Sequence, residues 1–239
     1  MIRIGKQIIV FFVFILNSIS FYGQTNSSQE NYYKWFDAVV GVGNTDLYNG
    51  IQYKRSYNTI NKNHEYFLSS DFIKGTVLYS NQPYFDVYLK YDIHNDELIA
   101  QLPSVKSNNT IQLIQQKVSS FSISGHSFVK LSAEGVSGFY EVLFEDSNIK
   151  FYKKYIKTIK KHLDKDFAYY VFTEKESYLL YYNNEYYQIK SKSNISKVLP
   201  NLKKDINLFY KNNTNLRKMN YELFLSKLSG YLSELISNN

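Results

Sequence analysis

Hydrophobic and polar residues alternate along the stretch from Gly75 to Leu102, which has the sequence GTVLYSNQPYFDVYLKYDIHNDELIAQL. From Phe85 to Ile93 every second residue is apolar, and charged residues such as Asp86 and Lys90 lie between them. A period of two is typical of a half-buried β-strand, because successive side chains point to opposite faces of a sheet. The alternation therefore predicts a strand with Phe85 and Ile93 on its buried face.

Turn-forming clusters lie on both sides of this strand. Asn81-Gln82-Pro83 precedes it and His94-Asn95-Asp96 follows it. Asn and Asp side chains bond their own backbone and Pro presets φ, so such clusters separate consecutive strands. The pattern predicts two hairpins of antiparallel strands.

Strand-like runs continue beyond these hairpins. They are Thr110 to Gln115, Val118 to Leu131 with a turn at Ser124-Gly125-His126, Gly138 to Phe144, Tyr169 to Phe172, and Tyr178 to Ile189 with a turn at Asn183-Asn184. Aromatic residues make up 18% of the chain, and Tyr and Phe favour half-buried pleated surfaces. Both observations favour a β-rich fold.

The basic stretch from Ile149 to Lys165 fits two structures. Its apolar residues fall on one helical face at Tyr152, Tyr155, Ile156, Ile159 and Leu163, or on one side of a strand at Phe151, Tyr155 and Ile159. We predict a long strand, with a helix as the alternative.

The spacing of apolar residues changes to three and four near the C-terminus. They recur at Ile195, Val198, Leu199, Leu202, Ile206 and Phe209, and again at Tyr221, Phe224, Leu225, Leu228, Leu232 and Leu235. Pro200 is tolerated at a first helical position, and Asn220 is a suitable N-cap for the last helix. The predicted fold is α+β, a mostly antiparallel sheet of hairpins with two or three C-terminal helices packed on it.

The N-terminus has the pattern of a secretory signal peptide. Arg3 and Lys6 precede an apolar run from Ile8 to Leu16, and a polar exit follows. The run is shorter than the ~20 residues of a spanning helix, so we predict cleavage, after Ser20 or after Gly23.

The predicted organisation is a signal peptide at residues 1–23 and a single domain at 24–239. The domain is strand-rich over about 24–192 and helical over 193–239, and no transmembrane span is expected after cleavage. The polar residues 24–31 are expected to form a disordered new N-terminus.

The composition excludes several classes of chemistry. The chain has no cysteine, so disulfides, thiolate catalysis and Cys-based zinc sites are ruled out. The formal net charge is +7, and two of the positive charges, Arg3 and Lys6, lie in the predicted signal peptide. The mild positive charge of an exported protein would favour association with anionic lipid or glycan, and no nucleic-acid partner is expected.

The polar clusters do not match catalytic or metal-binding motifs. A calcium loop starting at Asp92 needs Gly at its sixth position and an acid at its twelfth, where the chain has Glu97 and Pro103. The segment Gly135-Val136-Ser137-Gly138-Phe139 has Phe139 in place of the second glycine of a nucleophile elbow. The four His residues lack zinc-ligand spacing. We predict a non-enzymatic protein without a metal or cofactor.

Lysines concentrate between residues 149 and 165. The predicted contacts with an anionic surface are Lys150, Lys153, Lys154, Lys157, Lys160 and Lys161. The alternative is that these lysines form a solvated face.

Several aromatic and turn motifs carry a resemblance. They are Leu47-Tyr48-Asn49-Gly50-x-x-Tyr53, His64-Glu65-Tyr66-Phe67, Gly75-x-Val77-x-Tyr79, Tyr84-x-x-Val87-x-Leu89-x-Tyr91-Asp92, and Tyr186-Tyr187-x-Ile189 with the helical tail. On these residues the chain resembles a family of uncharacterised exported proteins of Bacteroidota, especially flavobacteria. The resemblance implies a β-rich fold and a cell-envelope location, and it implies no activity.

These observations lead to a functional hypothesis. We expect an exported, non-enzymatic interaction or accessory subunit in the periplasm or at the periplasmic face of the outer membrane, with an envelope protein, lipid or glycan as partner. The alternative is a periplasmic carrier that binds a lipid or other apolar ligand in a curved sheet. An open apolar cavity would favour the carrier, and a filled core with an exposed aromatic patch would favour the interaction protein.

Overall fold

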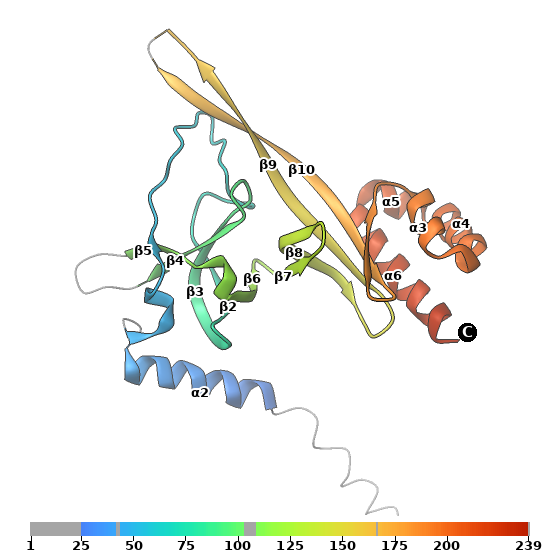
Figure 1. Cartoon of the computed structure of the whole chain (residues 1–239), viewed down its shortest axis with the longest axis horizontal. Coiled ribbons are helices and arrows are strands. Elements are labelled where there is room, and N and C mark those ends of the chain that lie inside the picture. Colours follow the sequence, from blue (N-terminus) through green and yellow to red (C-terminus); the bar gives the residue numbers. More distant parts are fainter. Residues whose placement is uncertain (1–24, 42–43, 103–108, 166, 239) are drawn as a thin grey trace, which may run out of the picture.

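One antiparallel β-sheet runs through the molecule (Figure 1). The computed structural model describes residues 25–41, 44–102, 109–165 and 167–238, and the predicted signal peptide lies outside them. The described sheet has eleven strands in the order β1-β5-β4-β3-β2-β6-β7-β8-β9-β10-β11. Helices follow in the C-terminal part, so the predicted α+β class is confirmed.

The strands are β1 (Ile51–Gln52), β2 (Ile73–Tyr79), β3 (Gln82–Asp92), β4 (Glu97–Leu102), β5 (Asn109–Gln112), β6 (Val118–Ile123), β7 (His126–Ala133), β8 (Val136–Glu145), β9 (Lys150–Leu163), β10 (Ala168–Tyr182) and β11 (Glu185–Ile189). The α-helices are α2 (Thr25–Val40), α3 (Lys192–Val198), α4 (Lys203–Asn212), α5 (Thr214–Met219) and α6 (Tyr221–Ser237). Short 3-10 helices are η2 (Asp46–Tyr48), η3 (Gln115–Lys117) and η4 (Pro200–Leu202).

The predicted meander of hairpins is confirmed. β2 pairs with β3 and β3 pairs with β4, both in antiparallel register. Their turns use left-handed backbone at Asn81 and Asp96, where φ is 63° and 61°. Asn and Asp tolerate this conformation because their short side chains hydrogen-bond locally. The turn residues therefore fix where each strand ends.

The ambiguous stretch after Ile149 is a strand, as predicted. β9 pairs with β10 along its whole length, from Lys150 opposite Tyr181 to Leu163 opposite Ala168. The sequence predicts two separate runs where β10 is one strand, because the polar residues 173–177 interrupt the apolar pattern. The continuous pairing with β9 holds those polar residues in extended conformation.

A β-bulge in β3 shifts the side-chain pattern that the sequence predicts. Gly75 pairs with Val87 and Val77 pairs with Tyr84, so β3 has one extra residue between these pairs. Asp86, at the bulge, has a φ of 56°. A bulge reverses the phase of the alternation. As a result Tyr84 is buried, and Phe85, predicted to be buried, is only partly covered.

Two large hydrophobic clusters form the core. The first lies under β2 to β8 and is rich in aromatic rings. Phe121 stacks on Phe128 with centroids 4.7 Å apart, and both rings also pack against Tyr91. Offset and edge-to-face ring pairs stabilise a core beyond the area that they bury. This part of the sheet is therefore a filled core.

The second cluster joins the C-terminal helices to β9, β10 and β11. Phe151 and Leu180 from the sheet contribute to it together with Phe224 and Leu228 from α6. The Asn220 side chain accepts a hydrogen bond from the Leu223 backbone N–H, so its predicted N-cap role is confirmed. Helices α3 to α6 lie together at the right-hand end of the molecule in Figure 1.

Helix α2 begins at Thr25, so the prediction of disorder for residues 24–31 is wrong from Thr25 onward. The helix lies against β3, where Lys34 Nζ is 2.7 Å from Asp86 Oδ2. Asp86 is exposed, as the alternation predicts, but the sequence pattern does not reveal the bulge or the left-handed backbone at this residue. Within the described residues no helix is long and apolar enough to cross a membrane.

Close strand packing makes Gly75 a sensitive position. A Cβ at Gly75 would lie 2.1 Å from the backbone oxygen of Ser122, so Gly75→Ala forces neighbouring strands apart. We expect a loss of about 1–3 kcal/mol in the free energy of unfolding, measured by urea denaturation.

Gly230→Ala in α6 is the matched control. Its Cβ would meet only the ring edge of Phe144, at 3.5 Å, and Ala has the higher helix propensity. We expect Gly230→Ala to raise stability by up to about 1 kcal/mol. Equal losses in the two variants would contradict this explanation.

Candidate functional site

The distal part of the β9–β10 hairpin projects beyond the rest of the sheet (Figure 1). β8 pairs with β9 only from Lys150 to Lys153, and β11 pairs with β10 only from Tyr178 to Tyr182. Residues 154–163 and 168–177, which we call the β9–β10 arm, pair with no third strand among the described residues, and an isolated bridge joins Tyr170 to Thr59. A two-stranded ribbon in water needs support from other parts of a protein.

The segment from Tyr57 to Tyr66 supplies that support. The Asn63 side chain accepts a hydrogen bond from the Phe172 backbone N–H (2.7 Å) and donates one to the Phe172 carbonyl oxygen (3.0 Å). Tyr57 packs edge-on against Tyr170 and Phe172, with centroids 5.3 Å away in both cases. The segment thus braces the arm up to Tyr170, which pairs with Lys161 near the end of the ladder.

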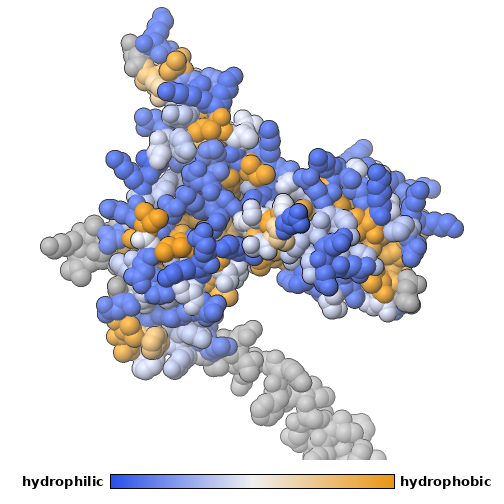
Figure 2. All heavy atoms as spheres, viewed as in Figure 1, coloured by the Kyte–Doolittle hydropathy of each residue, from blue (hydrophilic) through white to orange (hydrophobic). Residues whose placement is uncertain are grey.

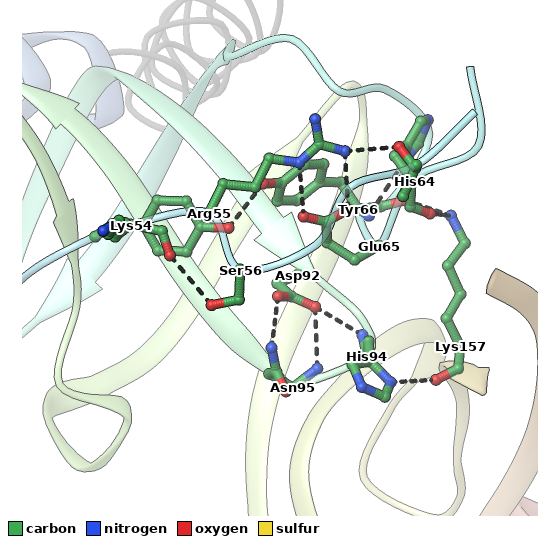
Figure 3. Close-up of polar contacts among 12 residues, drawn as sticks. Lys54, Arg55, Ser56, His64, Glu65, Tyr66, Asp92, His94, Asn95 and Lys157 are labelled. Atoms are coloured by element: carbon green, nitrogen blue, oxygen red, sulfur yellow. Dashed lines mark hydrogen bonds and ion pairs between the residues drawn. The ribbon is translucent and has the colours of Figure 1, made fainter. Parts of the chain in front are cut away.

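Lys157 ties the arm to the same segment (Figure 3). Its Nζ donates to the carbonyl oxygens of His64 at 2.9 Å and Tyr66 at 2.7 Å, while the His94 ring nitrogen Nδ1 lies 2.7 Å from the Lys157 carbonyl oxygen. Burial lowers the pKa of Lys157, and Glu174, with Oε2 at 3.8 Å, opposes that shift. Burial also lowers the pKa of His64, as does the nearby Lys157 ammonium. These groups brace the base of the arm.

The other polar groups of Figure 3 also have structural partners. The fully buried carboxylate of Glu65 accepts from Arg55 Nε at 3.2 Å and Nη2 at 3.3 Å. Asp92 accepts from the backbone N–H groups of His94 and Asn95 and from the Asn95 side chain. Such bonds fix a turn. The Asp92 motif of the sequence is therefore a hairpin turn.

Four of the six predicted anionic-surface lysines contact other parts of the protein. Lys150 pairs with Glu145, Lys153 with Glu176 and Glu222, Lys154 with Asp96, and Lys157 with the groups described above. Lys160 and Lys161 are exposed and form no ion pair with any residue that the structure describes. Lys160 and Lys161 are therefore the two of the six whose ammonium groups have no internal ion pair among the described residues, and the contact with an anionic surface stays a prediction.

Lys153 is the most deeply buried of these lysines. Its side chain is 1% exposed, and its ammonium lies 2.6 Å from Glu176 Oε1, contacts Glu222 of α6, and stands 4.0 Å from the centroid of the Tyr155 ring. A buried ammonium is costly unless carboxylates and hydrogen bonds compensate it. Lys153 therefore links β9 and β10 to the start of α6.

Apolar side chains mark the arm tip, which we define as Lys160–Lys165 with Phe167. Leu163 is 80% exposed and Phe167 is 54% exposed. The turn is closed by the Asp164 backbone N–H, which donates to the Phe167 carbonyl oxygen at 2.9 Å. Figure 2 shows hydrophobic atoms at the upper end of the molecule, where the arm ends. Two large exposed apolar side chains at the end of one projection make the arm tip a candidate contact surface.

A second surface feature is a groove under α2, which we call the α2 groove. It has a volume of about 680 Å³ and is lined by Lys34, Asp37 and Ala38 of α2, Leu47, residues Tyr84 to Tyr88 of β3, and Gln101 and Leu102 of β4. Burial raises the pKa of Asp37, and it raises the pKa of Tyr84 to about 12. Phe85 and Asp86, at the β3 bulge, line the groove beside α2.

The described residues do not assemble the remaining enzymatic motifs. Gly135 lies in the turn between β7 and β8, and Gly138, with a φ of 91°, lies in β8, so the segment is a hairpin. The His126 ring bonds Glu141 at 2.5 Å, and the His162 ring stacks on Tyr169. Among all the residues that the structure describes, no three His, Asp or Glu side chains are grouped so that they could hold a metal ion.

Comparison with known families, curated proteins and solved structures gives no match to this chain. The sequence does not predict the arm tip, because the exposure of Leu163 depends on where the neighbouring strands β8 and β11 stop. The outward face of α2 could have been predicted from the sequence. Its residues Tyr32, Trp35, Phe36 and Val39 are spaced three or four apart, as on one helical face.

The buried ammonium of Lys153 makes a testable prediction. Glu176→Gln/Glu222→Gln removes both carboxylates that compensate it, so we expect the free energy of unfolding to fall by roughly 3 kcal/mol in chemical denaturation. Glu145→Gln, which removes the partner of the more exposed Lys150, should cost less than about 1 kcal/mol. If the double variant loses as little free energy of unfolding as Glu145→Gln, the buried ammonium of Lys153 does not depend on the two carboxylates.

Proposed function

We propose that this protein is an exported, non-enzymatic interaction subunit of the cell envelope, and that the β9–β10 arm is its contact element. The observation that carries the proposal is the braced arm with Leu163 and Phe167 exposed at its end. An envelope location at the periplasmic face of the outer membrane is supported by the predicted signal peptide and by the resemblance to exported proteins of Bacteroidota.

The arm tip has the composition of a protein contact. Two large apolar side chains lie beside Lys160 and Lys161, which have no ion-pair partner among the described residues. Aromatic and apolar anchors contribute most of the binding energy of interfaces, and unpaired charges around them steer the encounter. We therefore propose a partner protein with an apolar pocket surrounded by carboxylates.

Site-specific photo-crosslinking in the native cell envelope tests this function. A crosslinking residue at Leu163 or Phe167 should give one discrete protein adduct, and the same residue at exposed Glu134 in the β7–β8 turn should not. The charge reversal Lys160→Glu/Lys161→Glu should lower the adduct yield about tenfold or more, because the new carboxylates repel the carboxylates proposed on the partner. An equal adduct yield at Glu134 and Leu163, or lipid adducts alone at Leu163, would overturn the arm as a protein contact.

The second candidate function is a carrier of an apolar ligand, and the α2 groove favours it. Its volume of about 680 Å³ lies within the range of small-molecule sites, and Leu47, Val87 and Leu102 give it apolar walls. The filled aromatic core argues against a ligand inside the sheet itself. Any ligand would therefore lie between α2 and β3.

Native mass spectrometry of the protein extracted gently from its own envelope tests the carrier. A stoichiometric lipid-sized adduct is expected if the groove is a ligand site, and Ala38→Phe should abolish the adduct because the ring occupies the groove. Ala133→Phe, at the exposed end of β7 and outside the groove lining, is the matched control and should keep it. Absence of any adduct in the wild type, or an adduct that persists in Ala38→Phe, contradicts the carrier function.

A further inference from the structure

The outward face of α2 is apolar in the C-terminal half of the helix, whereas residues 25–31 are polar. Its side chains are Tyr32 (60% exposed), Trp35 (59%), Phe36 (40%) and Val39 (65%), which we call the α2 aromatic face. Their spacing of three and four residues places them on one side of the helix. In Figure 2 hydrophobic atoms gather at the lower left, over the end of α2.

Contacts with the sheet fix this orientation. Lys34 Nζ lies 2.7 Å from Asp86 Oδ2 and also 2.7 Å from Glu30 Oε1, and Gln82 Nε2 donates to Asp37 Oδ1 at 3.3 Å. These polar residues lie on the inner side of the helix, so rotating the aromatic face toward the sheet would break their contacts. The helix is thus held with its polar side inward and its apolar side outward.

We infer that the α2 aromatic face binds the interfacial region of a lipid bilayer. Tyr and Trp are enriched at membrane–water interfaces, since their rings are apolar while their O–H and N–H groups reach water. A helix with a wide apolar face and low overall hydrophobicity lies in the plane of that interface. Three of the four side chains of the α2 aromatic face are Tyr, Trp or Phe.

The size of the face argues against a second copy of the chain as the occupant. At the exposures given above, four side chains offer on the order of 400 Å² of surface. A stable protein interface buries about 800 Å² on each partner. A bilayer has no such requirement, because it covers the face whatever its outline.

The charge distribution predicts how the binding depends on salt. Glu30, Lys34 and Asp37 are the charged residues of α2, and Lys34 is already paired with Glu30 and Asp86. The helix therefore offers no free positive charge to anionic lipid. Binding through the aromatic face should be driven by burial of apolar surface and should occur on phosphatidylcholine vesicles with little salt dependence.

Trp35 is the only tryptophan of the chain, so its fluorescence reports on this face alone. Titration of the exported protein with phosphatidylcholine vesicles should shift the emission to the blue, and brominated acyl chains should quench it. Tyr32→Ser/Phe36→Ser keeps the reporter and should weaken vesicle binding by about tenfold or more, because it removes much of the apolar area. Circular dichroism checks that the variant folds.

Leu163→Ser/Phe167→Ser is the matched control, since it removes exposed apolar groups at the arm tip and should leave vesicle binding unchanged. The inference is overturned if Trp35 is neither shifted nor quenched, or if its emission indicates a buried indole before lipid is added. It is also overturned if binding disappears at high salt. Because the lipid inference and the arm proposal use different residues, either can fail without the other.

Discussion

Backbone pairing between β9 and β10 is the constraint on which the rest of the structure depends. Its inner half, near Phe151 and Leu180, gives the C-terminal helices a surface to pack on. Its outer half leaves the sheet and becomes the arm. Because an antiparallel ladder transmits register along its whole length, the packing of α6 at one end helps to fix the arm at the other. One hairpin therefore belongs both to the core and to the proposed contact surface.

Buried polar groups strengthen the two places where this hairpin meets other elements. Lys153 joins it to α6, and Lys157 joins it to the backbone of His64 and Tyr66. A lysine stem packs along apolar surface while its ammonium reaches specific acceptors. Both lysines come from the basic stretch that the sequence assigns to an external anionic surface. In the structure their ammonium groups bind carboxylates and carbonyl oxygens of the protein itself.

The predictable features of the chain were those encoded locally. Turn clusters such as His94-Asn95-Asp96, the helical spacing after Ile195 and the cap at Asn220 depend on neighbouring residues, and each was found from the sequence. The bulge at Asp86 was not found, because an extra residue in one strand has meaning only against its partner strand. The partners of Lys153 and Lys157 were missed for the same reason, since Glu222 and His64 lie far away in the chain. The arm depends on where β8 and β11 stop pairing with β9 and β10, and no local pattern encodes that.

The separation of α2 from the arm tip gives the molecule two distinct ends (Figure 1). β9 has fourteen residues, and a strand rises about 3.3 Å per residue, so this hairpin alone spans about 45 Å. With one end resting on a surface, a rigid body of this kind would work as a spacer that holds its other end at a set height. The distance between what α2 and the arm tip bind would then be determined by the folded sheet between them rather than by a flexible linker.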